Sequence, residues 1–242
     1  ATADQLGGPT ANSQLDLQQI WVAEPYTAAS DKSITFTLKV HDLSPTPQPN
    51  SSWTVTFKVN DTQGIAREVF VSMETQTLPT PTFNYGWYDA VNDFNTSQCF
   101  AGLSACPVSG SFNADGTITL KLNTSAPISF NDLNGNHIFD ATIPAGTQLS
   151  EFGAETQLLI GAAGTGLGST TDDIPGSGAY TVAGNISCYS GEGDPACTSP
   201  GVVVVSDNGT NDATDAAPIH DIISTSVAYP FTSAGSPDQL VF

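Results

Sequence analysis

Apolar and polar residues alternate along much of the chain. The clearest cases are Ile34–Val40 and Trp53–Val59, in which every second residue is apolar. A period of two puts the apolar side chains on one face of an extended segment, so both segments are predicted to be half-buried antiparallel strands. Similar runs, bounded by Pro, Gly, Asn or Asp, predict strands at Leu17–Ala23, Ser33–His41, Trp53–Val59, Ala66–Met73, Thr117–Leu122, Thr156–Ile160, Tyr180–Ile186, Val202–Ser206, Ser226–Phe231 and Gln239–Phe242.

These short strands predict an all-β protein: an antiparallel β-sandwich of about ten strands with long loops and little helix. Helical spacing is limited to a short turn at Asp215–Ser224. Ser44–Ser52 and Ala162–Gly178 are predicted to be loops because they are rich in Pro, Gly, Ser and Thr. We expect one domain over residues 1–242, with residues 188–242 as an insertion or an extension at the edge of the sandwich.

The charge balance narrows the choice of partners. The chain has 5 Lys and Arg against 24 Asp and Glu, giving a formal net charge of −19. Nucleic acids and anionic membrane surfaces need clustered basic residues, so neither is an expected partner. No apolar run reaches the roughly 18 residues of a membrane span.

The four cysteines form two close pairs in the sequence, Cys99 with Cys106 and Cys188 with Cys197. Four cysteines allow three connectivities, and the short spacings favour the two local pairs. Neither spacing is Cys-x-x-Cys and no histidine is close, so structural disulfides are favoured over a zinc or redox site.

The sequence also has features of an extracellular product. The chain begins Ala1-Thr2-Ala3-Asp4, which is typical of a mature protein after signal-peptide cleavage. Six sequons for N-glycosylation, whose alternative interpretation is an ordinary Ser/Thr-rich exposed surface, begin at Asn50, Asn60, Asn95, Asn123, Asn185 and Asn208. We therefore expect a secreted protein at the cell surface or beyond it, with disulfides and with these asparagines as glycosylation candidates.

Several motifs resemble an extracellular β-sandwich domain of secreted bacterial proteins, often attached to subtilisin-like peptidases or polycystic-kidney-disease-type repeats. The resemblance covers roughly residues 4 to 188 and rests on Asp4-Gln5, Leu15–Ile20, Ala23–Pro25, Ile34–Val40, Trp53–Phe57, Val69–Thr75, Phe83–Gly86, Gly110–Thr119, Pro144–Leu149 and Tyr180–Cys188. These are strand and turn motifs, so the resemblance implies the fold and the compartment. Since no peptidase domain accompanies it in this sequence, we expect an independent role.

One segment has the spacing of a calcium loop. Asp132–Asp140 places oxygen-bearing side chains at its positions 1, 3, 5 and 9, as in a tight loop that wraps Ca²⁺. The twelfth position is Ile143 instead of Glu, and the sixth is His137 instead of Gly. The alternative is a metal-free turn, because Asn and Asp favour such bends on their own. The candidate ligands are Asp132, Asn134, Asn136 and Asp140, with Glu151 or backbone carbonyls completing the shell.

A second ion site at Asp4, Asp16 and Glu24 is the weaker alternative to ordinary solvated carboxylates. Catalytic motifs are missing: the sequence has no Gly-x-Ser-x-Gly, His-Glu-x-x-His, P-loop or dinucleotide fingerprint. The sequence contains no nucleophile motif with which the three histidines, His41, His137 and His220, could act as a catalytic base. We therefore expect no enzymatic activity.

An aromatic cluster at Phe83, Tyr85, Trp87 and Tyr88 either belongs to the core or forms a platform that stacks on sugar rings. The leading hypothesis is a non-catalytic structural protein that assembles with copies of itself into a surface filament or layer. Its apolar end, Gln239–Phe242, would suit strand addition. The alternative is a carbohydrate-binding or adhesive module of a secreted hydrolase system, with Tyr85, Trp87 and Tyr88 as stacking residues.

Overall fold

The computed structural model describes residues 13–25, 32–76, 80–89, 94–99, 106–132, 134–159, 168–185 and 201–206. Within these ranges the chain forms β-strands and a single 3-10 turn, Ser13–Leu15. The strands pair antiparallel and the sheets pack together, so the predicted all-β sandwich with little helix is confirmed.

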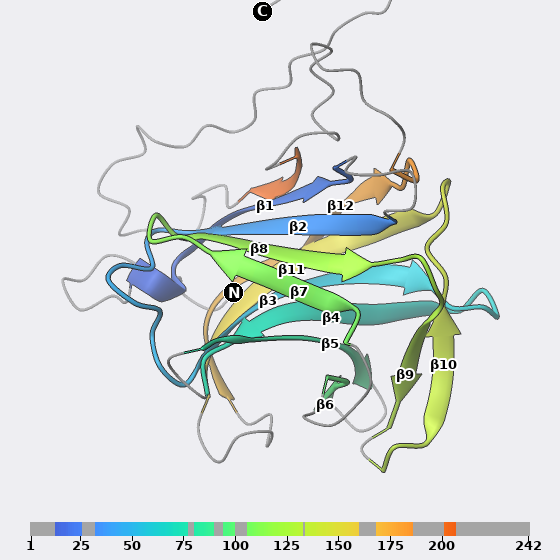
Figure 1. The fold of residues 1–242 in the computed structure, drawn as a ribbon, viewed down its shortest axis with the longest axis horizontal. Helices are drawn as coiled ribbons and strands as arrows, with labels where there is room; N and C mark the ends of the chain where they lie inside the picture. Colours follow the sequence, from blue (N-terminus) through green and yellow to red (C-terminus); the bar gives the residue numbers. More distant parts are fainter. Residues whose placement is uncertain are drawn as a thin grey trace, which may run out of the picture.

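The strands form two main sheets and a separate hairpin (Figure 1). The five-stranded sheet has the order β13-β1-β2-β8-β7; its strands are β1 Leu17–Ala23, β2 Ser33–Val40, β7 Val108–Phe112, β8 Thr117–Asn123 and β13 Val202–Ser206. The six-stranded sheet has the order β12-β11-β3-β4-β5-β6; its strands are β3 Ser51–Asn60, β4 Ala66–Glu74, β5 Thr82–Asp89, β6 Phe94–Ser97, β11 Gln148–Leu159 and β12 Gly168–Thr181. The hairpin consists of β9 Ile128–Asn131 and β10 His137–Ala141.

The core lies between the two main sheets, where their apolar faces meet. Phe36 of β2 and Trp53 of β3 have no exposed surface. Phe36 stacks on Phe57 with 5.0 Å between ring centroids, and Phe57 lies 5.9 Å from the ring of Phe152 on β11. Burial of side chains of this size contributes about 1.5–3 kcal/mol each. The alternation in β2 and β3 therefore marks the inner faces of the two sheets.

The prediction for β11 and β12 is wrong. The pattern predicts a strand only at Thr156–Ile160 and a loop at Ala162–Gly178, whereas β11 begins at Gln148 and β12 at Gly168. As an edge strand, β12 pairs on one side only, which accommodates its Gly, Asp and Pro residues despite their low β propensity. The strand predicted at Tyr180–Ile186 ends at Thr181.

Some predicted features lie outside the described residues. These are the strands at Ser226–Phe231 and Gln239–Phe242, the turn at Asp215–Ser224 and the N-terminal Ala1-Thr2-Ala3-Asp4. Of residues 188–242, the described part is Gly201–Ser206, and its strand β13 pairs with β1 at the edge of the five-stranded sheet.

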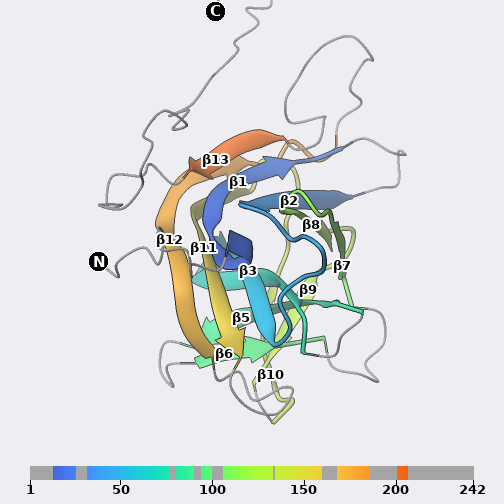
Figure 2. The ribbon, with the colours of Figure 1, turned by 90° about the vertical axis from the view of Figure 1, so that its left-hand side faces the viewer.

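The two sides of the sandwich differ. On one side the edge strands β12 and β13 lie close together, as Figure 2 shows. Gly178 allows this approach because a Cβ there would clash with the Val204 carbonyl oxygen, and its φ of 71° also favours glycine. On the other side the edge strands are β6 and β7, and the β9–β10 hairpin lies nearby (Figure 1).

Candidate functional site

The aromatic residues of β5 lie on two different faces of the strand. The register with β4 places Tyr85 and Trp87 on the inner face, beside core valines. Only 7% of Trp87 is exposed, and its indole N–H donates to the Asn131 carbonyl oxygen at 2.9 Å. Tyr88 occupies the opposite face and is half-buried. The three stacking candidates therefore do not form one exposed platform.

Tyr85 and Trp87 instead hold the β9–β10 hairpin against the six-stranded sheet. Phe130 and Phe139 of the hairpin stack with 4.5 Å between their ring centroids. Tyr85 meets Phe130 edge-on at 5.5 Å, and Trp87 meets Phe139 edge-on at 5.4 Å. Each such pair contributes about 0.5–1.5 kcal/mol beyond burial of its area. The tyrosine hydroxyl also donates to the Ser129 carbonyl oxygen at 3.0 Å.

Arg67 joins this hairpin to the turn between β3 and β4. Its guanidinium carbon lies 4.8 Å from the centroid of Phe139, and its Nε–H donates to Asp61 Oδ2 at 2.9 Å. The Asp61 side chain is only 1% exposed, and its Oδ1 accepts the N–H groups of Gln63 and Ile65 at 2.8 and 2.9 Å. Burial raises the pKa of Asp61, but these N–H donors and the guanidinium outweigh burial, so the pKa lies below its usual value.

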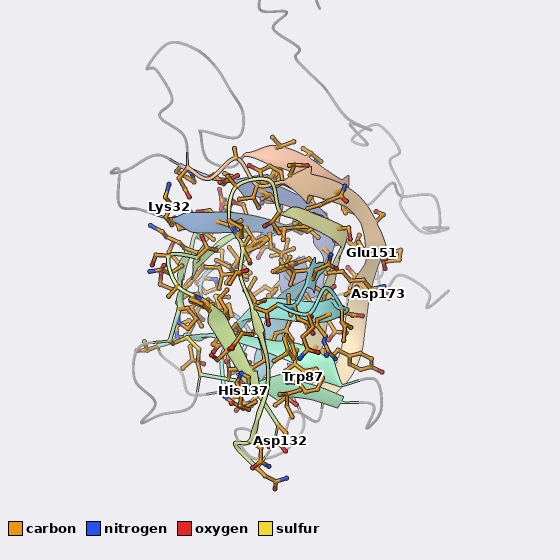
Figure 3. The ribbon with its side chains drawn as sticks, turned by 90° about the vertical axis from the view of Figure 1, so that its right-hand side faces the viewer. Lys32, Trp87, Asp132, His137, Glu151 and Asp173 are labelled. Atoms are coloured by element: carbon orange, nitrogen blue, oxygen red, sulfur yellow. A yellow bond between two sulfur atoms is a disulfide. The ribbon has the colours of Figure 1, made fainter. Side chains whose placement is uncertain are left out.

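The loop from Asp132 is a compact turn at the tip of the hairpin (Figure 3). Asp132 Oδ1 accepts the backbone N–H groups of Asn134 and Asn136, both at 2.8 Å, and Oδ2 accepts the Asn136 side-chain amide at 2.9 Å. The Asn136 and Asn134 donors lower the pKa of Asp132. Both carboxylate oxygens thus face N–H groups of their own loop, as in a metal-free turn.

The other candidate ligands have partners of their own. Asp140 lies on β10, where its Oδ1 accepts the Ser129 hydroxyl at 2.6 Å and lies 3.0 Å from His137 Nε2. Glu151 forms an ion pair with Lys58 at 2.5 Å. Among the residues that the structure describes, no three His, Cys, Asp or Glu side chains are grouped so that they could hold a metal. Binding of Ca²⁺ by this loop stays a prediction.

Glu24, one of the residues considered for a second ion, is a buried hydrogen-bond acceptor. It is 2% exposed. Its Oε1 accepts the Tyr180 hydroxyl at 2.8 Å and the Ala183 N–H at 2.6 Å. Its Oε2 accepts the N–H groups of Gly184 at 2.7 Å and Asn185 at 2.9 Å. The carboxylate therefore ties the end of β1 to the turn that follows β12.

Of its two proposed partners, Asp16 directly precedes β1 and Asp4 lies outside the described residues.

The sequon asparagines differ in accessibility. Three are exposed: Asn50, Asn60 and Asn123. Asn185 is 5% exposed, and its Nδ2 donates to the Ser33 carbonyl oxygen at 2.8 Å while its Oδ1 accepts the Ser33 N–H at 3.0 Å. Asn185 is thus the buried one of the four sequon asparagines whose side chains the structure describes, and its glycosylation stays a prediction. The side chain of Asn95 and all of Asn208 lie outside the described part.

The predicted local disulfide between Cys99 and Cys106 is present, with 5.4 Å between the Cα atoms. Cys99 follows β6 and Cys106 precedes β7, so the bond joins the edge strands of the two sheets. The Cys99 N–H also donates to Asn84 Oδ1 at 2.8 Å, which fixes the bond beside β5. Cys188 and Cys197 lie outside the described residues.

The hydrogen bonds around β7 show which of its backbone groups face β8. The Asn113 N–H donates to the Thr117 carbonyl oxygen at 2.9 Å, and the Asn123 N–H donates to the Pro107 carbonyl oxygen at 2.8 Å. Hydrogen-bonded and non-hydrogen-bonded pairs alternate along an antiparallel ladder. With the observed register, every second residue of β7 between these two pairs is bonded to β8.

Ser109 and Ser111 are the residues bonded to β8, so the backbone groups of Val108, Gly110 and Phe112 point to the free edge. Within the described ranges no hydrogen bond reaches that edge. The strand has the sequence Val-Ser-Gly-Ser-Phe. It lacks the charged residues and prolines that commonly protect exposed sheet edges. This edge is the best candidate for a binding surface.

Both described histidines lie beside a carboxylate. His41 is exposed and lies 3.2 Å from Asp42 Oδ2, and His137 is paired with Asp140 on the hairpin. Burial raises the pKa of Glu74, on the outer face of β4, and the Ser72 hydroxyl at 3.3 Å opposes the increase. His220 lies outside the described residues.

Comparisons with protein-family models, curated proteins and solved structures find no match for the chain. The resemblance to a domain of secreted bacterial proteins therefore stays an expectation. No helix in the described ranges is long and apolar enough to span a membrane.

Proposed function

We propose that this chain is a non-catalytic structural protein that acts outside the cell and assembles with copies of itself. The observation that carries the proposal is the free edge of β7, where the backbone groups of Val108, Gly110 and Phe112 have no partner within the described residues. Such an edge pairs readily with an extended segment of another chain. The Cys99–Cys106 disulfide supports an oxidising compartment.

The side chains next to this edge also favour strand addition. Phe83 and Phe112 are half-buried and pack against the core. Gly110 brings β7 close to the Phe83 ring, where a Cβ would leave 2.5 Å to the nearest ring carbon. A strand added beside β7 would place alternate side chains near these rings. It would also extend the five-stranded sheet to six strands, the number in the sheet that it faces.

The carbohydrate-binding alternative has less support, because Tyr85 and Trp87 contact the hairpin. Binding to a glycan array that disappears in Trp87→Ala, with the fold retained, would favour that alternative.

Sedimentation velocity and electron microscopy of the full chain test the proposal. We expect wild-type protein to form assemblies that grow with concentration. In Ser109→Lys/Ser111→Lys, two exposed serines of β7 become lysines, which disfavour edge pairing. We expect this variant to need about tenfold more protein for the same degree of association, equivalent to about 1.4 kcal/mol.

Thr62→Lys/Ser80→Lys is the matched control, because both residues are exposed and lie outside β7. We expect it to assemble like the wild type. Wild-type protein that stays monomeric up to millimolar concentration would overturn the proposed function. An edge variant that assembles as well as the control would overturn the role of β7.

A further inference from the structure

The sequence of β7 has nearly the same pattern when it is read in either direction. Val-Ser-Gly-Ser-Phe places Gly110 at the centre, with Ser109 and Ser111 beside it and the apolar Val108 and Phe112 at the ends. The two serines are exposed, whereas Val108 is buried and Phe112 packs against the core. The strand therefore presents the same order of apolar and polar side chains from both ends, and it lies at the edge of its sheet (Figure 1).

The backbone groups at this edge have the same symmetry. The N–H and C=O groups of Val108, Gly110 and Phe112 point away from β8 and have no partner among the described residues. In an antiparallel ladder, two directly opposite residues of a hydrogen-bonded pair exchange both of their N–H···O bonds. When Gly110 lies opposite Gly110 of a second copy, Val108 of each copy lies opposite Phe112 of the other. Each outward N–H group then meets an outward C=O group.

We infer that β7 pairs antiparallel with β7 of a second copy, about a two-fold axis at Gly110. This inference rests on the proposed self-assembly and names the segment that pairs with the free edge. A two-fold contact is isologous: the same edge serves both copies, and the contact closes a dimer. The two five-stranded sheets then become one continuous sheet. A filament or layer would join such dimers through a different surface.

The side chains that meet in this arrangement are compatible. On the inner face, Val108 lies opposite Phe112, and a β-branched side chain beside an aromatic one is a favourable cross-strand pair. On the outer face, serine lies opposite serine. At the axis, the ring of Phe83 lies beside Gly110, where a Cβ would leave 2.5 Å to the nearest ring carbon. Because glycine has no side chain, nothing at the axis displaces this ring in either copy.

The local charge permits a second copy as the partner although the whole chain is acidic. Each copy has a net charge of −19, so copies repel each other where their carboxylates come close. No charged residue occurs between Asp93 and Asp115, a stretch that includes all of β7. In the antiparallel pair, the two turns that begin at Asn113 and carry Asp115 lie at opposite ends, at least about 20 Å apart. This separation exceeds the Debye length of about 8 Å at physiological salt, so the turns are screened from each other.

Cysteine cross-linking tests both the pairing and its register. Ser109 of each copy would lie opposite Ser111 of the other in a non-hydrogen-bonded pair, with about 4.5 Å between the Cα atoms, and a disulfide spans about 4.4–6.8 Å. Identical positions of the two copies would be offset by two residues, which places their Cα atoms about 8 Å apart, beyond the reach of a disulfide. A mixture of Ser109→Cys and Ser111→Cys, treated with oxidised glutathione, should therefore give at least about tenfold more covalent dimer on a non-reducing gel than either variant alone.

Thr62→Cys mixed with Ser109→Cys is the matched control, because Thr62 is exposed and lies outside β7. We expect no increase in covalent dimer in this mixture. Mass spectrometry should find the disulfide of the covalent dimer between the two introduced cysteines, and an unchanged urea midpoint shows that each variant folds.

Three results would count against the inference. If wild-type protein associates but the mixture gives no more covalent dimer than the single variants, pairing of β7 with itself is overturned, while association of β7 with another segment stands. If each variant alone forms as much covalent dimer as the mixture, the inference is overturned as well, because identical positions would then be adjacent. A monomeric wild type would instead remove the proposed function, and the inference with it.

Discussion

Replacing Glu24 with glutamine tests how far a buried carboxylate holds this fold together. Glu24 accepts four hydrogen bonds, two at each oxygen, from Tyr180, Ala183, Gly184 and Asn185. Glutamine has the same shape but exchanges one acceptor oxygen for an NH₂ group. In either orientation of the amide, that NH₂ group faces two donors and can accept from neither.

The expected loss follows from those two donors. A buried donor left without a partner costs about 1–3 kcal/mol. Glu24→Gln should therefore lower the free energy of unfolding by about 2–6 kcal/mol. Tyr180→Phe is the matched comparison, because it removes only one of the four donors and leaves both oxygens as acceptors. Its expected cost is about 0.5–1.5 kcal/mol, with a small addition because the lost bond is to a charged group.

Urea unfolding at pH 7, followed by tryptophan fluorescence, measures both variants. Equal m-values would show that the comparison concerns stability and not a change in the unfolded state. We expect the loss in Glu24→Gln to be at least twice the loss in Tyr180→Phe. If Glu24→Gln is as stable as the wild type, or matches Tyr180→Phe, the turn does not need a carboxylate and the reasoning is refuted.

Four further experiments probe other parts of the molecule. The fold lowers the pKa of Asp61, so its carboxylate stabilises the protein when the pH is above the ordinary pKa of 3.8, and this stabilisation is lost as the pH falls below that value. Asp61→Asn should therefore lower the free energy of unfolding at pH 7, whereas in acid the unfolding curves of the variant and the wild type should converge. The pKa of Glu74 is raised in the fold, which means that ionisation of this carboxyl group disfavours folding. Glu74→Gln should therefore raise the melting temperature at pH 7. It should have no effect at a pH well below 4.5, where the carboxyl group is protonated in both the folded and the unfolded state. Phe130→Ala removes the contacts with Phe139 and Tyr85 and should cost about 3–5 kcal/mol in denaturant unfolding; a cost below about 1 kcal/mol would contradict the role given to this cluster. If the Asp132 loop binds Ca²⁺, a chelator should lower the melting temperature in wild type and have no effect in Asp132→Ala; an unchanged wild-type melt would exclude the site.

The strands that the sequence predicts well are those with one apolar and one polar face. Phe36 and Phe57 lie on such faces, and both are at the centre of the core. The strand β5 carries the same alternation in Phe83, Tyr85 and Trp87, but its aromatic residues also suit a ligand platform. Only the tertiary contacts with the hairpin decide between these two interpretations, because burial depends on what covers the strand.

Other features could not be predicted because no local pattern encodes them. The hydrogen bonds that Glu24 accepts come from Tyr180 and from the turn up to Asn185, which are 156 to 161 positions away in the sequence. The sequon at Asn185 reads as a surface motif, yet its amide binds Ser33, 152 positions away. Gly86 lies within a strand because the Phe70 ring and the Thr96 carbonyl occupy the space of a Cβ. In each case the reason lies in a segment distant in sequence.

The difference between the two sides of the sandwich bears on the proposed assembly. Where β12 and β13 approach each other at Gly178, the sheet edges shield one another, so an incoming strand would first have to separate them. At β7 the sheets are joined by the Cys99–Cys106 bond at one end of the strand. A disulfide that closes a short loop typically stabilises a fold by about 2–3 kcal/mol. It holds the two sheets together without occupying the backbone groups of Val108, Gly110 and Phe112, which have no partner among the described residues. In the proposed assembly, a partner strand could therefore pair at β7 without breaking any hydrogen bond of this strand to the described residues, which favours this side for strand addition.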